Sequence, residues 1–276
     1  MKTDINRALF FKVCYDSTVK KHERFNIGTY KEKQLHIILK HYFEPDSNYH
    51  EVPYQGFIAD NTRENRITEI ETSGFSGLSE KLDAFLPECS VNLVYPIPHI
   101  RYIAWIDPIS GDISQKRRSP KKPGVYEALF EMVRIRQHIR NPNLTVTAML
   151  LNVDEYRMLD GWSRDRKKGS NRYERIPTDI CEIFEFKTDA DYLSCIPETC
   201  GDAFTVPEFS KEAHITARTA YAVIRVFEER GIVERNGKKG RANLYRKVTE
   251  QAKESGLSSD AECCKTECEG ISREND

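Results

Sequence analysis

The chain has 276 residues, which at about 150 residues per domain is enough for two domains. Its 42 lysines and arginines nearly balance its 43 aspartates and glutamates, so the formal net charge is −1. Hydrophobic residues make up 39% and aromatic residues 10%, which is enough to build cores and argues against wholesale disorder. No segment approaches about 18 consecutive apolar residues, and the first residues lack a secretory signal. We therefore expect a cytoplasmic protein without a membrane partner.

Residues 1–27 are set apart as an N-terminal extension, and residues 28–201 are assigned to the first folded domain. In this domain the hydrophobic spacing alternates between helical and strand periods, which is typical of an α/β fold. Helices are expected at Thr29–Phe43, Phe75–Leu86 and Tyr126–Ile139. Strands are expected at Glu51–Gln55, Gly56–Asn61, Arg66–Thr72, Val91–Pro96, Tyr102–Asp107, Asp112–Lys116, Leu144–Asn152 and Glu182–Phe186.

Residues 202–249 predict a smaller α+β domain. Thr205 is expected to cap a short helix over Pro207–Ala213, and Thr216 to cap a longer helix over Ala217–Arg230, which Gly231 ends. Two strands around a Gly-Lys-Lys-Gly tip complete a basic hairpin. This order of elements predicts a winged helix-turn-helix.

The last residues, 250–276, contain eight acids against three bases and almost no large apolar side chains. They predict a disordered acidic tail. The eight cysteines of the chain have spacings unlike those of a zinc ribbon, and no signal peptide accompanies them, so we expect free thiols.

Four acidic residues of the first domain occupy informative positions. Glu69 and Glu71 are two residues apart on one predicted strand, so they project from the same face while Ile70 points to the core. Asp60 closes the preceding strand, and Glu32 lies on or beside the apolar stripe of the first helix. Because converging carboxylates repel one another, a hard divalent cation is their natural partner. Such a cation can activate water and stabilise a phosphodiester transition state.

The pattern Asp60, eight intervening residues, then Glu69-Ile70-Glu71 resembles the PD-(D/E)XK nuclease superfamily in its ExE variety. The expected order αβββαβ matches the core of that superfamily. The resemblance implies a restriction-endonuclease-like mixed sheet with flanking helices, and Mg²⁺ (or Mn²⁺) bound by Asp60 and Glu69. Glu71 stands where the family more often has lysine, and Glu32 corresponds to an acidic residue on the first helix. The wider stretch Gly28–Pro177 also resembles bacterial proteins of unassigned function.

Two simpler interpretations remain open at this stage. Glu69 and Glu71 could form the solvent-facing side of a half-exposed strand, with Thr68, Ile70 and Thr72 pointing inward. His36, one helical turn after Glu32, is either a group that supports the site or a partly exposed helix residue.

Three basic clusters interrupt the overall neutrality and predict contacts with phosphates. The run Lys116–Lys122 is equally well explained as a solvated loop. A basic loop over Arg164–Arg175 and the predicted wing favour double-stranded DNA, with the start of the longer helix entering a major groove. The residues expected to bind nucleic acid are Arg164, Arg166, Lys167, Lys168, Arg172, Arg218, Thr219, Tyr221, Lys238, Lys239 and Arg241.

The sequence lacks a glycine-rich phosphate-binding loop, a nucleophile elbow and a zinc-protease motif. Two hypotheses therefore stand. The first is a Mg²⁺-dependent DNA endonuclease with Glu32, Asp60, Glu69 and Glu71 as catalytic residues, for which a second copy of the chain in a homodimer is a candidate partner. The second is a non-catalytic DNA-binding transcriptional regulator with a degenerate nuclease-like domain. Winged helices also mediate protein contacts, which is the competing interpretation of the smaller domain.

Overall fold

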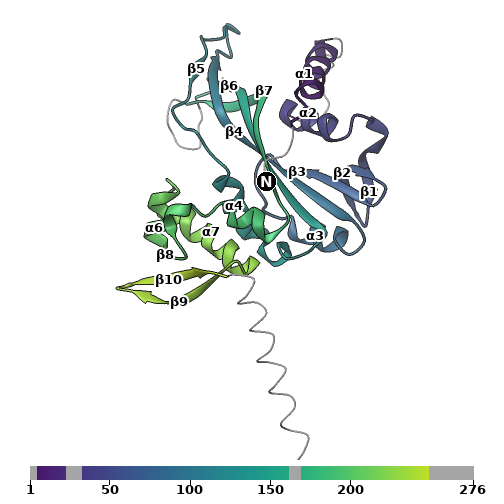
Figure 1. Cartoon of the computed structure of the whole chain (residues 1–276). Coiled ribbons are helices and arrows are strands. Elements are labelled where there is room, and N and C mark those ends of the chain that lie inside the picture. The colour runs from purple at the N-terminus through teal and green to yellow at the C-terminus, as the bar shows by residue number, and fades with distance from the viewer. Residues whose placement is uncertain (1–4, 23–32, 162–168, 249–276) are drawn as a thin grey trace, which may run out of the picture. The chain divides into compact units, whose positions relative to one another are not determined.

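A computed structural model describes residues 5–22, 33–161 and 169–248. The chain divides into two compact units, Met1–Ser194 and Cys195–Asp276, which are described separately (Figure 1). The predicted boundary between the domains lies after residue 201, whereas the boundary in the structure lies after Ser194. The tail over residues 250–276 and the segment Arg164–Lys168 lie outside the described residues, as does Glu32.

The first unit contains a large mixed sheet with helices on both sides, as expected for an α/β fold. Its elements are α1 (Arg7–His22), α2 (Gln34–Phe43), the 3₁₀ helix η1 (Ser47–Tyr49), β1 (His50–Tyr54), β2 (Phe57–Arg63), β3 (Arg66–Ile70), α3 (Ser79–Phe85), β4 (Ser90–Ile106), β5 (Arg117–Arg118), α4 (Tyr126–Met132), the 3₁₀ helix η2 (Val133–His138), β6 (Leu144–Met158), β7 (Asn171–Phe186) and α5 (Asp189–Leu193).

The sheet has the strand order β1-β2-β3-β4-β6-β7, and β5 pairs with the far half of β4. Strands β1, β2 and β3 form an antiparallel meander. After the crossover through α3, β4 lies parallel to β3, β6 lies parallel to β4, and β7 returns antiparallel to β6. The predicted order of helix, three strands, helix and strand is therefore confirmed over residues 34–106.

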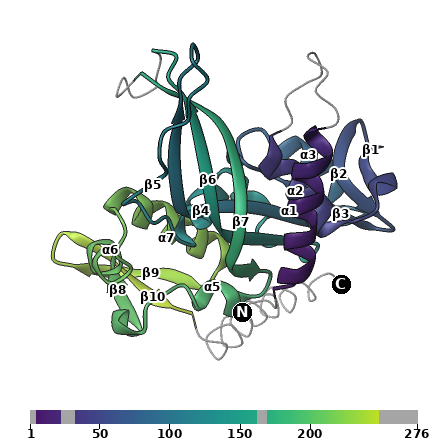
Figure 2. The ribbon, with the colours of Figure 1, turned by 90° about the horizontal axis from the view of Figure 1, so that it is seen from above.

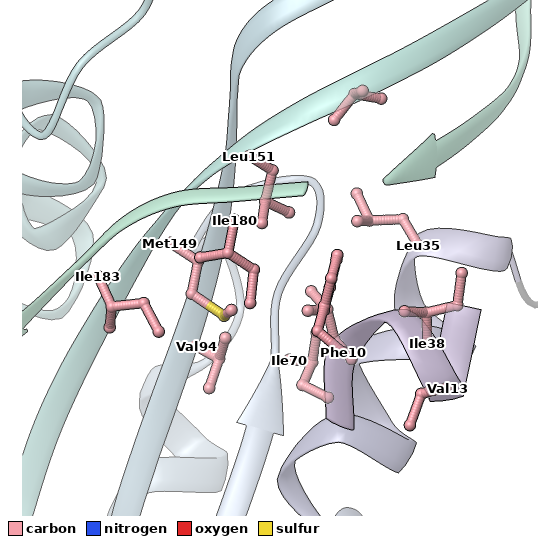
Figure 3. Packing of buried hydrophobic residues seen from close by; sticks show 12 residues of the cluster. Phe10, Val13, Leu35, Ile38, Ile70, Val94, Met149, Leu151, Ile180 and Ile183 are labelled. Carbon is pink, nitrogen blue, oxygen red and sulfur yellow. The ribbon is translucent and has the colours of Figure 1, made fainter. Parts of the chain in front are cut away.

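Helices α1 and α2 cover one face of this sheet (Figure 2). Phe10 of α1 and Ile38 of α2 are fully buried against side chains of β3, β4, β6 and β7 (Figure 3). The residues 1–27 that the sequence analysis treated as an extension therefore contain a helix of the core. Ile67 and Leu93 point to the opposite face of the sheet, because side chains alternate along a strand. They are also fully buried, on the face where α3 and α4 contact β4.

Strand β4 differs from the prediction because it is one long strand. The sequence predicts one strand that ends at Pro96 and another that begins at Tyr102. In the structure, pairing of β4 with β3 ends at Val94, while pairing with β6 continues to Ile106. Pro96 and Pro98 thus lie where one edge of β4 has no neighbouring strand among the described residues, and an edge tolerates a missing N–H donor.

Two other expectations need adjustment. The helix predicted over Tyr126–Ile139 is an α-helix only as far as Met132 and continues as a 3₁₀ helix with a non-helical residue at Ile135. β-Branched residues in this stretch have a low preference for α-helix. The strand predicted from Glu182 begins much earlier, at Asn171, so part of the expected basic loop is strand.

The far halves of β4, β6 and β7 extend past the end of β3 as a curved ribbon, here called the arm (residues 100–106, 152–158 and 171–179) (Figure 1). Glu155 is fully buried in the arm. Its carboxylate lies 3.0 Å from Nε of Arg175, 2.8 Å from Nη2 of Arg157 and 3.6 Å from Nη1 of Arg101. Arg175 was predicted to lie in a phosphate-binding loop, whereas in the structure its guanidinium pairs with Glu155.

The cost of burying Glu155 is balanced by these three guanidinium groups. Burial by itself raises the pKa of the carboxyl, but Arg175 and Arg157 more than offset it, so the pKa lies below its ordinary value. Each arginine comes from a different strand of the arm. The carboxylate therefore ties the three strands together at a point beyond the hydrophobic core.

The second unit has two helices and a small antiparallel sheet. Its elements are the 3₁₀ helix η3 (Glu198–Cys200), β8 (Ala203–Thr205), α6 (Val206–Glu212), α7 (Ala217–Arg230), β9 (Val233–Lys239) and β10 (Ala242–Lys247), and the sheet order is β8-β10-β9.

The predicted helix ends of the second unit are confirmed. The hydroxyl of Thr205 accepts from the backbone N–H of Glu208, whose carboxylate accepts from the N–H of Thr205. Thr216 caps α7 through the N–H of Thr219. Gly231 ends α7 in the left-handed conformation, with φ 81°. The apolar stripe expected on α7 is buried, and it consists of Ala220, Val223, Ile224 and Phe227.

No disulfide links the cysteines within the described residues, which are Cys14, Cys89, Cys181, Cys195 and Cys200. Cys263, Cys264 and Cys268 lie outside that part of the chain. Within the described ranges, none of the helices combines the length and the apolar character that a membrane crossing requires.

Candidate active site

The predicted carboxylates converge where β2 and β3 separate. The ladder between these strands ends at the pair Asn61 and Thr68. Beyond this pair, hydrogen bonds from backbone N–H groups to side-chain carboxylates replace the bonds between the two backbones. The N–H of Asp60 donates to Oε1 of Glu69 at 3.2 Å, and the N–H of Ile70 donates to Oδ2 of Asp60 at 2.8 Å. The two carboxylates thus hold the strand ends while facing one another.

Helices from both sides of the sheet contribute a base and a cation to this cluster. From α2, Nε2 of His36 lies 3.1 Å from Oδ2 of Asp60. From α3, Nζ of Lys81 lies 2.6 Å from Oε2 of Glu69. Glu69 has only 3% of its side chain exposed, and the other three side chains are 18–20% exposed. The alternative in which Glu69 faces solvent is therefore wrong, while Ile70 points to the core as predicted.

Glu71 lies directly after β3 and joins the cluster from the same face. Its N–H donates to the carbonyl oxygen of Val94 at 2.9 Å, which continues the pairing of β3 with β4. Its carboxylate accepts no hydrogen bond from the described residues, although the side chain is partly buried. Burial and the neighbouring charge of Asp60 raise the pKa of Glu71.

The environment separates the pKa values of Asp60 and Glu69. Burial raises both, but the hydrogen bond and charge of His36 outweigh burial at Asp60, and its pKa falls below the ordinary value. At Glu69, burial and repulsion by Asp60 outweigh the attraction of Lys81, and the pKa rises from 4.5 to about 7. Two carboxyl groups with pKa values driven apart are typical of catalytic sites, although buried ion pairs produce the same effect.

We expect Glu69 to titrate near neutral pH, where Asp60 is already ionised because its pKa lies below the ordinary value. Because folding raises the pKa of Glu69 from 4.5 to about 7, the folded state binds this proton more tightly than the unfolded chain. The resulting stabilisation is complete below pH 4.5 and is lost as the pH rises through 7. Carbon-13 NMR of the side-chain carboxyl, assigned by its loss in Glu69→Gln, measures the midpoint.

The same variant checks the link to stability. Relative to Glu69→Gln, the free energy of unfolding of the wild type should fall between pH 4.5 and 7 and then level off. A carboxyl midpoint near 4.5 would mean that Glu69 is solvated in solution, contrary to its burial in the structure.

Lys81 was not among the predicted site residues. Glu71 stands where the nuclease family more often carries a lysine, and the structure brings the ammonium of Lys81 to the cluster from α3. A signal was available in the helix periodicity. Lys81 lies three residues after Leu78 and four before Phe85, which places it beside the apolar stripe that faces the sheet.

The donor set has the chemistry that a hard cation prefers. Asp60 and Glu69 offer carboxylate oxygens, and Glu71 adds one that no described residue engages. Oδ1 of Asp60 likewise accepts no hydrogen bond within the described ranges. Both oxygens of Glu69 are engaged, however, and no group of three Asp, Glu, His or Cys side chains in the described segments is arranged as a metal site. Binding a cation through Glu69 therefore requires Lys81 to move from Oε2.

The predicted nucleic-acid-binding residues are spread over both units. In the first unit, Arg172 is exposed on β7. In the second, Arg218 and Tyr221 are exposed in the first two turns of α7, while the hydroxyl of Thr219 lies 2.9 Å from that of Thr216 and takes part in the cap. On the β9–β10 hairpin, Lys238, Lys239 and Arg241 are exposed.

The hairpin is less purely basic than the sequence indicated. Nζ of Lys239 lies 2.6 Å from Oε1 of Glu208, and Arg246 pairs with Glu234. Lys238 and Arg241 form no ion pair with any described carboxylate.

The fold and the cluster together define the first unit as a mixed α/β sheet with carboxylates, an imidazole and an ammonium at the divergence of two strands. The chain belongs to the family described as "Domain of unknown function (DUF8091)", which matches residues 33–187, more than half of its length. This match begins at α2 and ends just after β7, so it covers the whole cluster and the arm.

One relative is an uncharacterized protein of Treponema pallidum (strain Nichols). It is 26% identical over 222 residues, which cover 80% of this chain and 87% of the relative. No solved structure matches the chain.

Proposed function

We propose that the first unit is a metal-dependent nuclease of the PD-(D/E)XK type that hydrolyses phosphodiester bonds in DNA. The observation that carries the proposal is the convergence of Asp60, Glu69 and Glu71 with the ammonium of Lys81 where β2 and β3 separate. The element order α2-β1-β2-β3-α3-β4, with β4 parallel to β3, supports it because the resemblance implies the same order.

Asp60 and Glu69 would hold Mg²⁺ or Mn²⁺. When bound, such an ion lowers the pKa of its water ligand and stabilises charge on the phosphoryl oxygens. His36 is a positioning residue, because its contact with Oδ2 keeps the Asp60 carboxylate ionised and oriented. Glu32 lies outside the described residues, and we retain it as a supporting acid.

Glu71 and Lys81 are suited to move a proton and to stabilise charge in the reaction. Glu71 has a raised pKa and a carboxylate that no described donor occupies, which suits it to orient and deprotonate water. Lys81 holds an ammonium beside Glu69. Released from Oε2, it would stabilise the negative charge that develops on the phosphoryl group.

We propose that the second unit is a winged helix-turn-helix that targets double-stranded DNA. The order α6, turn, α7, β9, β10 supports this, and Arg218 and Tyr221 are exposed at the start of α7. Residues 201–249 carry ten bases against six acids, so this region is positive although the whole chain is nearly neutral. Lys238 and Arg241 offer charges to phosphates.

Cleavage of supercoiled and linear DNA in Mg²⁺ or Mn²⁺ tests the enzyme. We expect wild-type protein to convert both substrates, and Asp60→Asn and Glu69→Gln each to abolish conversion. Asp46→Asn is a matched control, because Asp46 is a carboxylate of the same unit that caps η1 outside the cluster. Wild-type protein that leaves DNA intact with either metal contradicts the proposal.

A second candidate is a DNA-binding regulator without catalysis. It is favoured by one observation: both oxygens of Glu69 are satisfied, by the N–H of Asp60 and by Lys81, so the cluster is complete without an added ion. In that case wild-type protein binds duplex DNA without cutting it, and Glu69→Gln leaves the affinity for DNA unchanged.

A further inference from the structure

A basic cleft lies along β4 in the first unit, outside the carboxylate cluster. It has a volume of about 370 Å³ and is bounded on one side by His99 and Ile100 of β4. The other side is the segment Arg117–Lys122, which contains β5. From the sequence, this basic run was equally well explained as a solvated loop.

Hydrogen bonds fix the wall of the cleft to the sheet. Tyr102 and Ile103 of β4 pair with β5, and the N–H of Ser119 donates to the carbonyl oxygen of Arg101 at 2.8 Å. Nδ1 of His99 lies 2.6 Å from the carbonyl oxygen of Pro123, which anchors the far end of the segment. Pro120 and Pro123 stiffen the chain between these contacts.

The cleft concentrates positive charge that no carboxylate neutralises. Arg117, Arg118, Lys121 and Lys122 are all exposed, and none forms an ion pair with a described acid. Their neighbour Lys116 does, because its Nζ lies 2.6 Å from Oδ2 of Asp154. Four cations on six consecutive residues repel one another, and an anionic ligand would remove this repulsion.

The geometry favours a polyanion over a single small anion. The cations are exposed around an open cleft, where one small anion would remain hydrated and weakly held. A six-residue segment reaches at most about 20 Å, and a DNA strand presents a phosphate roughly every 3.4 Å of helix axis. Successive cations of a rigid segment can therefore contact successive phosphates.

We propose that this cleft binds the phosphodiester backbone of a nucleic acid strand. The proposal rests on the nuclease or DNA-binding function proposed above and adds the place where the first unit holds its substrate. Strand β4 connects the two sites. It pairs with β3 at Val94 beside Glu71 and reaches the cleft at His99, five residues later, which is at most roughly 17 Å of strand.

Binding of a short fluorescein-labelled DNA duplex to the full-length protein tests the proposal. Measurements are made in EDTA over a series of salt concentrations, so that no cleavage occurs. The variants are Arg117→Ala with Arg118→Ala, and Lys121→Ala with Lys122→Ala. The control is Lys12→Ala with Arg66→Ala, which removes the same charge from exposed positions of the same unit that do not line the cleft.

We expect each cleft pair to weaken binding about tenfold or more at low salt. The slope of log Kd against log salt concentration should fall by about 0.9 for each phosphate that the variant no longer neutralises, so by roughly 2 for each pair. The control pair should retain the wild-type slope. All side chains involved are exposed, and circular dichroism verifies that the variants fold.

The proposal is overturned if the cleft variants and the control variant show the same slope of log Kd against log salt concentration. It is also overturned if the wild-type protein does not bind the duplex. A third contrary result is a cleft that binds inorganic pyrophosphate while the cleft variants keep the wild-type affinity for DNA. Failure of the nuclease proposal can be distinguished from failure of the cleft proposal. DNA bound through the cleft but never cut contradicts catalysis alone, whereas DNA cut equally well by the cleft variants contradicts the cleft alone.

Discussion

Replacing Glu155 by alanine is expected to destabilise the first unit by about 3–5 kcal/mol. Glu155 is fully buried and is the carboxylate partner of Arg101, Arg157 and Arg175 in the arm. Removing it leaves partly buried guanidinium groups close together without a counter-charge. Nε of Arg101 is already buried without a hydrogen-bond partner. The loss of Glu155 would therefore add further unpaired polar groups to this buried position.

Urea unfolding followed by tryptophan fluorescence measures this loss selectively. Both tryptophans, Trp105 and Trp162, belong to the first unit, so the signal does not report the second. Glu155→Gln keeps the side-chain volume but removes the charge, and we expect it to cause most of the same loss.

The adjacent residue Asp154 gives a matched control. It forms an ion pair with Lys116 at 2.6 Å, but the lysine side chain is 48% exposed. A solvent-screened pair of this kind contributes little, so Asp154→Ala should cost less than about 1 kcal/mol. Equal losses for the Asp154 and Glu155 variants would contradict the special role of the buried cluster.

The second large effect is expected for Lys81→Met, which should reduce DNA cleavage by about 10²- to 10³-fold. The substitution keeps the length of the side chain and removes the ammonium that lies 2.6 Å from Glu69. Lys81→Arg, which keeps the charge, should retain more activity than Lys81→Met. Initial rates of plasmid nicking at saturating Mg²⁺ measure both.

The pH profile tests whether Lys81 acts through the protonation of Glu69. Lys81 lowers the pKa of Glu69, which burial and Asp60 raise to about 7. Without the ammonium this pKa rises further, so the residual activity of Lys81→Met should reach its plateau at a higher pH than that of the wild type. A lower rate with an unmoved profile would mean that the ammonium of Lys81 does not act on Glu69.

Lys40→Met is the control for this experiment. Lys40 is also a largely buried lysine on a helix, but its Nζ lies 2.8 Å from Oε1 of Glu51, a carboxylate outside the cluster. The Lys40→Met variant should cleave DNA at the wild-type rate. If Lys81→Met and Lys40→Met are indistinguishable from wild type, Lys81 has no part in catalysis.

Much of the local structure was predictable because its causes lie within a few residues. The capping hydroxyls of Thr205 and Thr216, the glycine at 231 and the apolar stripe of α7 act over one or two helical turns. The strand that carries Glu69 was found in the same way, because alternation every second residue is a local signal. Ile70 points to the core for this reason.

The candidate site was predictable only in part. The positions of Asp60 and Glu69 follow from their places on adjacent strands of a meander, and the structure brings them into contact. Lys81 reaches Glu69 only because α3 crosses the sheet, and nothing within its own helix marks that contact except its place beside the apolar stripe. A helical period shows which side faces inward but not what lies opposite.

The sequence by itself determined the α/β character of the first unit, the order of its meander and crossover, and the helices, caps and hairpin of the second, because these depend on short-range spacing. Only the tertiary structure decided that α1 belongs to the core, that β4 is one strand, and that Glu155 is enclosed by three arginines. Those features depend on pairing between residues far apart in the chain. The distribution of charge is one such feature. The net charge of −1 is an average over the whole chain, and it does not indicate that Glu155 is buried among arginines or that four cations line one cleft.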